Sequence, residues 1–248
     1  MWHDYGRKII NAIFKKRADG TAICAELGSK VQANSDRSNI RMFEAGLSLE
    51  QYGDYEQSTG VAAQEEESRR IINIAKSKGL FIPKSDWQQF GDRKRLPSGE
   101  SIVFLNEQET VITKILDPFA KAVIKSLHAQ DAIYEHLIHN ILFPTTHYSF
   151  IGISEDFDGV RMILQQKYFS RYFLTPTQKS INEYLMSGLG LHLEDRYYYA
   201  NDYFAVTDVS ADGDNVLTDE RNLYFIDPII KFKKPAVEVL EHYYKLLK

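Results

Sequence analysis

The chain has 248 residues, of which 44% are hydrophobic, and a formal net charge of −4. This composition is typical of one large or two small globular domains. It excludes a mainly disordered chain and a nucleic-acid-binding domain recognised by bulk positive charge. A single cysteine, Cys24, excludes an intrachain disulfide scaffold. No segment has the apolar length of a signal peptide or a membrane span, which predicts a cytoplasmic protein without a membrane partner.

The first half of the sequence changes character at residue 64. Residues 1–63 show no clear period and are interpreted as a helical N-terminal extension of unassigned role. Beyond them, acidic, apolar and basic residues and then Gly79 follow in the order typical of a helix from start to end. Short β-branched runs then predict a hairpin, and apolar residues three and four apart predict a helix that Pro144 ends. The predicted elements are a helix over 64–79, strands over 102–105 and 111–115, and a helix over 119–143.

The second half alternates short apolar runs with turns. Two runs joined by an acidic turn predict another hairpin, and Pro176 at a first helical position predicts a helix to about Met186. Hairpins with interposed helices predict an α+β fold and not a doubly wound sheet. The predicted elements are strands over 148–153 and 159–165, a helix over 176–186, strands over 203–207, 216–217 and 223–226, and a helix over 236–247.

Acidic residues are concentrated in 202–220, which contains six of them and no Lys or Arg. A further carboxylate, Asp227, directly follows the apolar run 223–226. A carboxylate at the end of an apolar strand is costly unless it faces a cleft, a cation or a hydrogen-bond donor. The pattern therefore predicts a functional role for Asp227.

The arrangement of these acids resembles the catalytic segment of the protein-kinase-like fold. The resemblance is carried by Val-Thr-Asp at 206–208, Asn-Val-Leu at 215–217 and Tyr-Phe-Ile-Asp-Pro at 224–228. Upstream, Lys114 lies on a predicted strand and Glu135 in the helix that follows, as the kinase lysine and its glutamate partner would.

A narrower resemblance covers roughly residues 65–234. It is to the kinase-like domains called polyvalent protein kinases, which occur in large proteins of bacterial mobile elements and phages. The motifs that carry it are Gly-Glu-Ser at 99–101, His-Asn at 139–140, Phe-Pro at 143–144, Gln-Gln at 165–166 and Asp-Pro-Ile at 227–229.

The resemblance implies a reduced two-lobed kinase-like fold. It implies an N-lobe over 64–168, with an antiparallel sheet and a helix, and a small, mainly helical C-lobe over 169–248. The implied activity is transfer of the γ-phosphoryl group of ATP, with Mg²⁺ or Mn²⁺, to a protein, a small molecule or the chain itself. The implied roles are phosphate binding by Lys114, orientation of Lys114 by Glu135, placement of the acceptor by Asp208, metal binding by Asn215 and Asp227, phosphate covering by Gly99 and Ser101, and adenine binding by Gln166 and Tyr168.

Two site assignments have alternatives. Asp208 and Asn215 are seven positions apart, where the kinase pattern has about five, so 211–214 is interpreted as containing a two-residue insertion. Asp212 is therefore the alternative to Asp208. Asp131, one turn before Glu135, is the alternative partner of Lys114.

Two other functions are compatible with the same residues. The altered spacing, Val-Thr in place of His-Arg before Asp208, and the short second lobe favour a non-catalytic nucleotide-binding or interaction module. A Ca²⁺-binding loop is the third reading, because acidic and turn residues match an EF-hand-like order. Positions 1, 3, 5, 6, 7 and 12 of that loop would be Asp208, Ser210, Asp212, Gly213, Asp214 and Asp219.

Overall fold

The computed structural model describes residues 61–94, 101–119, 129–169 and 173–235, together with Glu238, Val239 and His242. These residues form two compact units. The first contains the described residues up to Tyr134 and those of 148–168, and the second contains 135–147 and the described residues from Phe169 onward. The predicted N-terminal extension, except for 61–63, the loop residue Gly99 and most of the predicted helix over 236–247 lie outside the described residues.

The first unit is built on a five-stranded antiparallel sheet in the order β1-β2-β3-β5-β4. Both predicted hairpins are confirmed: β2 pairs with β3, and β4 pairs with β5. The polar turn between β2 and β3 is closed by Asn106, whose Oδ1 accepts from the backbone N–H of Thr110 and of Val111. The elements are α3 (Val61–Ser77), the 3₁₀ turn η1 (Lys84–Phe90), β1 (Asp92–Lys94), β2 (Ser101–Leu105), β3 (Val111–Leu116), β4 (Tyr148–Asp156) and β5 (Gly159–Lys167).

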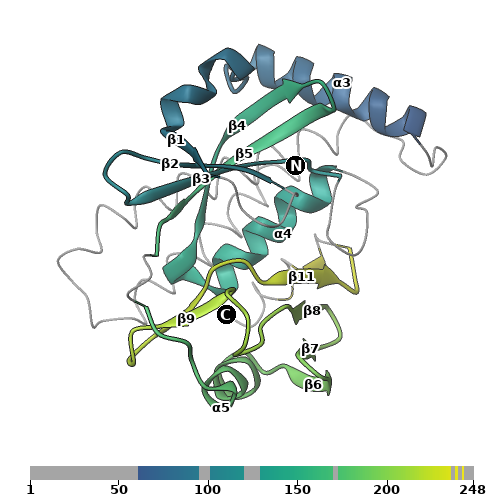
Figure 1. Ribbon diagram of the computed structural model, residues 1–248. Helices are drawn as coiled ribbons and strands as arrows, with labels where there is room; N and C mark the ends of the chain where they lie inside the picture. Colours follow the sequence, from purple (N-terminus) through teal and green to yellow (C-terminus); the bar gives the residue numbers. More distant parts are fainter. Residues whose placement is uncertain are drawn as a thin grey trace. The chain divides into compact units, whose positions relative to one another are not determined.

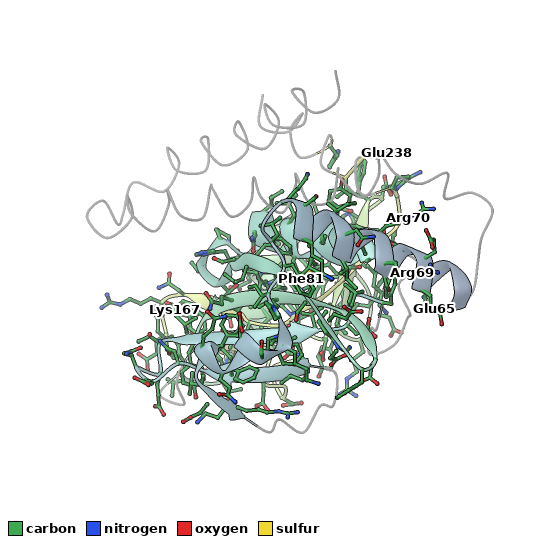
Figure 2. All side chains as sticks on the ribbon, turned by 90° about the horizontal axis from the view of Figure 1, so that it is seen from above. Glu65, Arg69, Arg70, Phe81, Lys167 and Glu238 are labelled. Carbon is green, nitrogen blue, oxygen red and sulfur yellow. The ribbon has the colours of Figure 1, made fainter. Side chains whose placement is uncertain are left out.

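Helix α3 packs on β4 and β5 through one face (Figure 1). Its buried residues recur at helical spacing and are Glu67, Ile71, Ile72 and Ala75. Figure 2 shows Glu65, Arg69 and Arg70 along the exposed part of the same helix. Gly79, with a φ of +66°, ends the helical segment as the sequence predicts.

Both faces of the sheet carry buried apolar residues. One face carries the apolar core of Trp87, Phe90, Phe104, Ile115 and Ile163, which η1 completes. The indole N–H of Trp87 donates to the Ser154 hydroxyl at 2.9 Å, so the polar edge of this ring has a partner. The other face carries Lys114 among the buried apolar residues Val103, Met162 and Leu164.

The second unit contains a four-stranded antiparallel sheet in the order β11-β8-β7-β6 and the separate hairpin β9–β10. It also contains the end of α4 (Ala129–Leu142), whose first residues belong to the first unit. The remaining elements are the 3₁₀ turn η2 (Pro144–Thr146), α5 (Gln178–Asn182), the π-helical turn η3 (Glu183–Gly188), β6 (His192–Asp195), β7 (Tyr198–Ala200), β8 (Phe204–Thr207), β9 (Val216–Thr218), β10 (Leu223–Phe225) and β11 (Ile229–Phe232).

Two expectations for this half of the chain need correction. A mainly helical second lobe does not match the described residues from Phe169 onward, because strands β6 to β11 make up most of their regular structure. The helix predicted to begin at Pro176 begins at Gln178, because the Thr177 hydroxyl accepts from the Ser180 N–H and Thr177 is therefore the N-cap. Strands over 203–207, 216–217 and 223–226 are confirmed with small shifts at their ends. Within the described ranges, no helix combines the length and hydropathy needed to cross a membrane.

Candidate functional site

In the first unit, strand register places several predicted site residues on one face of the sheet. Lys114 in β3 lies opposite Val103 of β2 and Leu164 of β5. Side chains alternate along a strand, so residues two positions from these partners share the face of Lys114. Ser101 and Gln166 therefore lie on this face.

Lys114 is buried, with 8% of its surface exposed. Its Nζ donates to the hydroxyl of Tyr148 at 3.0 Å and lies 5.2 Å from the centre of that ring. Tyr148 is the first residue of β4, lies opposite Gln166 in the register and is 1% exposed. A buried ammonium group is costly unless polar partners surround it, and Tyr148 is such a partner. The sequence does not single out Tyr148, because its contact with Lys114 joins residues 34 positions apart.

The other predicted nucleotide-binding residues have varied surroundings. Gln166 is 3% exposed near the end of β5, and Tyr168 follows that strand, where its N–H donates to the Thr110 carbonyl at 2.8 Å. Lys167, between them, is exposed and projects outward (Figure 2). Glu135 lies in the part of α4 that belongs to the second unit and is half-buried.

In the second unit, Asp208 and Asn215 are in direct contact. The Asn215 Nδ2 donates to the Asp208 carboxylate at 2.6 Å and to the Asp208 backbone carbonyl at 3.3 Å. Asp208 follows β8 with a φ of +61°, a left-handed conformation that Asp tolerates better than most residues. The chain therefore turns sharply at the end of β8, and the carboxylate is held by the amide of Asn215.

Two strand ladders bring Asp227 to the same place. Thr207 of β8 lies opposite Ile229 of β11, so Asp208 comes immediately after this ladder and Asp227 two residues before it. In the β9–β10 hairpin, the N–H of Ile226 donates to the carbonyl of Asn215 at 2.7 Å, which extends the pairing by one residue. Asp208, Asn215 and Asp227 therefore converge at one end of two ladders, although they are spread over 20 positions.

The residues between Asp208 and Asn215 form a tethered turn. The N–H of Ala211 donates to Gln178 Oε1 at 2.9 Å, and the N–H of Gly213 donates to the Ser210 carbonyl at 3.2 Å. The residues that lengthen this segment relative to the kinase pattern thus form a local loop, called here the excursion, and Asp208 still contacts Asn215. Asp212 lies within this excursion and is exposed.

An aromatic cluster packs around Phe225, in the strand that leads to Asp227. The Phe225 ring stacks on Phe143 with a centroid distance of 4.4 Å and lies 4.9 Å from Tyr184. The Tyr184 hydroxyl donates to the Leu142 carbonyl at 3.1 Å, and the His139 Nε2–H donates to the Phe225 carbonyl at 3.1 Å. Burial is the main cause that lowers the pKa of His139 from 6.5 to about 3.

The EF-hand-like order of acids does not form a loop of that type. Strands β8 and β9–β10 flank it where an EF-hand has helices. Asp219 lies in the β9–β10 turn, at the other end of β9 from Asn215, and accepts from the Tyr224 hydroxyl at 2.8 Å and from the Asn222 N–H at 2.7 Å. Within the described ranges, no group of three or more His, Cys, Asp or Glu residues is placed to hold a metal ion.

Comparison with known proteins identifies the family of the chain. The model of a family described as serine/threonine/tyrosine kinases found in polyvalent proteins matches residues 64–234. The chain belongs to this kinase family. Searches of curated proteins and of solved structures found no match to the chain. The mixture of helices and antiparallel sheets described above is therefore that of a kinase-like α+β domain.

The kinase family implies a divalent cation and a nucleotide, and the residues present fit both chemically. Asn215 and Asp227 supply an amide oxygen and a carboxylate, which are hard oxygen ligands of the kind that Mg²⁺ takes. Two such protein ligands suffice for Mg²⁺, because phosphate oxygens and waters complete its shell. Lys114, a buried cation whose sheet face also carries Ser101 and Gln166, suits a phosphate group.

Proposed function

We propose that this kinase-like domain transfers the γ-phosphoryl group of ATP to an acceptor hydroxyl in the presence of Mg²⁺ or Mn²⁺. The observation that carries the proposal is the convergence of Asp208, Asn215 and Asp227 at one end of two strand ladders. Phosphoryl transfer needs little covalent chemistry from the protein, and most of its catalysis is positioning and charge stabilisation. A cluster of two carboxylates and one amide held by backbone ladders is suited to that task.

The acidic cluster divides into two roles. Asn215 and Asp227 would hold the metal ion, which, when bound, neutralises phosphate charge. The Asn215 nitrogen already donates to Asp208, so the amide oxygen is the atom with ligand chemistry. Asp208 would orient the acceptor hydroxyl and accept its proton, because its carboxylate is held in place by Asn215.

The sheet face that carries Ser101, Lys114 and Gln166 supplies nucleotide-binding residues of the proposal. Lys114 would bind phosphate oxygens, and Glu135 would orient it, with Asp131 as the alternative. The remaining assignments follow the family pattern: Gly99 and Ser101 would cover the phosphates, and Gln166 and Tyr168 would contact adenine. The proposed lobes are 64–168 and 169–248, preceded by the extension 1–63.

The test is phosphate transfer from γ-labelled ATP by the purified chain, with the chain itself and dephosphorylated casein as acceptors. The proposal predicts label transfer that needs Mg²⁺ or Mn²⁺ and is lost in Asp227→Asn. The matched control is Asp214→Asn, which makes the same change at an exposed position in the loop before Asn215 and should transfer label at the wild-type rate. Equal transfer by wild type and Asp227→Asn would contradict the assignment.

Thermal melting of the same proteins separates catalysis from binding alone. A ligand at about 100 times its Kd adds roughly 2.7 kcal/mol, or about 2–4 °C for a chain of this size. A shift that needs both ATP and Mg²⁺ without label transfer would identify a non-catalytic nucleotide-binding module. A shift with Ca²⁺ alone and none with ATP and Mg²⁺ would contradict the proposed nucleotide site.

A further inference from the structure

Helix α4 contacts the strand that leads to Asp227 through the buried side chain of His139. His139 is 2% exposed, and its Nε2–H donates to the backbone carbonyl of Phe225, two residues before Asp227. The next amide, that of Ile226, donates to Asn215. Consecutive residues of this strand are therefore tied on one side to α4 and on the other to the proposed metal ligand Asn215.

Aromatic packing reinforces the same junction. Phe143, one turn after His139, stacks on the Phe225 ring, so two residues of the α4 region contact one residue of β10. The ring contact depends on apolar surface, whereas the His139 hydrogen bond fixes the direction of the Phe225 carbonyl. The Phe225 carbonyl and the Ile226 N–H belong to one peptide plane, so the hydrogen bonds to His139 and Asn215 fix this plane from both sides, and hence the path of the chain into Ile226 and Asp227.

We propose that His139 is a positioning residue for Asp227: its hydrogen bond to the Phe225 carbonyl sets the strand path that places Asp227 beside Asn215 and Asp208. The inference rests on the proposed function in assigning Asp227 to metal binding. Family resemblance links His139 only to a sequence motif, and its role in placing Asp227 follows from the contacts of its ring.

Two amide substitutions distinguish the effect of the His139 hydrogen bond from the effect of packing. In His139→Gln the side-chain nitrogen lies near the position of Nε2, whereas in His139→Asn it lies near Nδ1 and cannot reach the Phe225 carbonyl. Tyr184→Phe is the control, because it removes the hydrogen bond to Leu142 in the same cluster and keeps the ring against Phe225. His139→Leu, which fills the site without a donor, replaces the asparagine variant if that variant does not fold.

The first readout is amide hydrogen exchange at Ile226, measured without nucleotide or metal. His139→Asn is expected to raise the exchange rate of this amide about tenfold, the equivalent of one lost buried hydrogen bond. The expected change in His139→Gln and Tyr184→Phe is less than about threefold. Equal protection of Ile226 in the asparagine and glutamine variants would overturn the inference.

The second readout is the Mg²⁺ concentration that gives half-maximal phosphate transfer. It is expected to rise about tenfold in His139→Asn and to stay within about twofold of wild type in His139→Gln and Tyr184→Phe. An unchanged Mg²⁺ requirement in His139→Asn would also overturn the inference. A wild-type chain that transfers no phosphate would contradict the proposed function, while the exchange measurement would still decide whether His139 orders the strand.

Discussion

The pH dependence of stability gives a quantitative test of the junction between α4 and β10. In the folded protein the pKa of His139 is lowered from 6.5 to about 3. Burial is the largest cause of this shift, and the nearby His136 adds to it. The hydrogen bond to Phe225, the charge of Asp227 and the hydrogen bond to Asn140 raise the pKa but do not restore it. The folded protein therefore keeps His139 neutral at pH values where the unfolded chain protonates it.

The sign and size of the effect follow from this difference. Between pH 6.5 and about 3 the unfolded state binds more protons than the folded state, so stability falls as the pH falls through this window. At pH 5, about 1.5 units below the unfolded pKa, keeping the imidazole neutral costs about 2 kcal/mol. Below about pH 3 both states bind the proton, so the free energy of unfolding should lose no more through His139.

The assay is urea unfolding followed by far-ultraviolet circular dichroism at pH 7 and pH 5. The comparison protein is His139→Gln, which retains an N–H donor and does not titrate. Wild type should lose about 2 kcal/mol more than this variant between the two pH values. Burial also lowers the pKa of His147, but this residue is present in both proteins and its contribution cancels. An identical pH dependence in the two proteins would refute the burial argument.

Three further predictions concern the site and its scaffold. Asp208→Asn should reduce phosphate transfer at least about 100-fold, as expected for a general base, whereas Asp212→Asn in the exposed turn should have little effect; the reverse order would give the catalytic role to Asp212. Tyr148→Phe removes the hydroxyl that accepts from Lys114, so the KM for ATP should rise about tenfold while the melting temperature stays within a few degrees. An unchanged KM would show that this contact does not position the lysine. Gly91→Ala should lower the free energy of unfolding by more than about 2 kcal/mol, because its Cβ would lie 2.1 Å from a backbone oxygen of β2; denaturant unfolding with less than about 0.5 kcal/mol of loss would contradict this packing.

The regular hairpins of the fold could be predicted because their signals are local. The β-branched run that forms β3 and the polar turn before it specify a strand and a reversal within a few residues. The same holds for the apolar runs of β4 and β5. Strand β6 gives no such signal, because its four residues, His192–Asp195, are all exposed and lack apolar alternation. Its position depends on pairing with β7, which a local pattern does not encode.

In the candidate site, too, some residues could be predicted from a local signal and others could not. Asp227 could be found because a carboxylate directly after an apolar strand is conspicuous in the sequence. The choice between Asp208 and Asp212 could not be made from spacing alone, since the extra residues could lie on either side of the functional acid. The side chain of Gln178, 33 positions before Ala211, holds the excursion in place, and no sequence rule predicts that contact.

Tyr148 and His139 illustrate a different limit. Each is a buried polar residue whose partner is distant in sequence, so the sequence pattern around it is that of an ordinary core position. Their partners become evident only when strand register and helix packing bring Lys114 and Phe225 beside them.

We propose above that Asp208, Asn215 and Asp227 together form a binding site for a metal–nucleotide complex. Calorimetric titration of ATP into the wild-type chain and into Asp227→Asn, each with Mg²⁺ and with EDTA, tests it most directly because no acceptor needs to be known. We expect binding that requires Mg²⁺ and that weakens by at least about tenfold in Asp227→Asn, with no loss in Asp214→Asn. Mg²⁺-dependent binding of equal affinity in wild type and Asp227→Asn would place the metal elsewhere and contradict the assignment of Asp227 to this site.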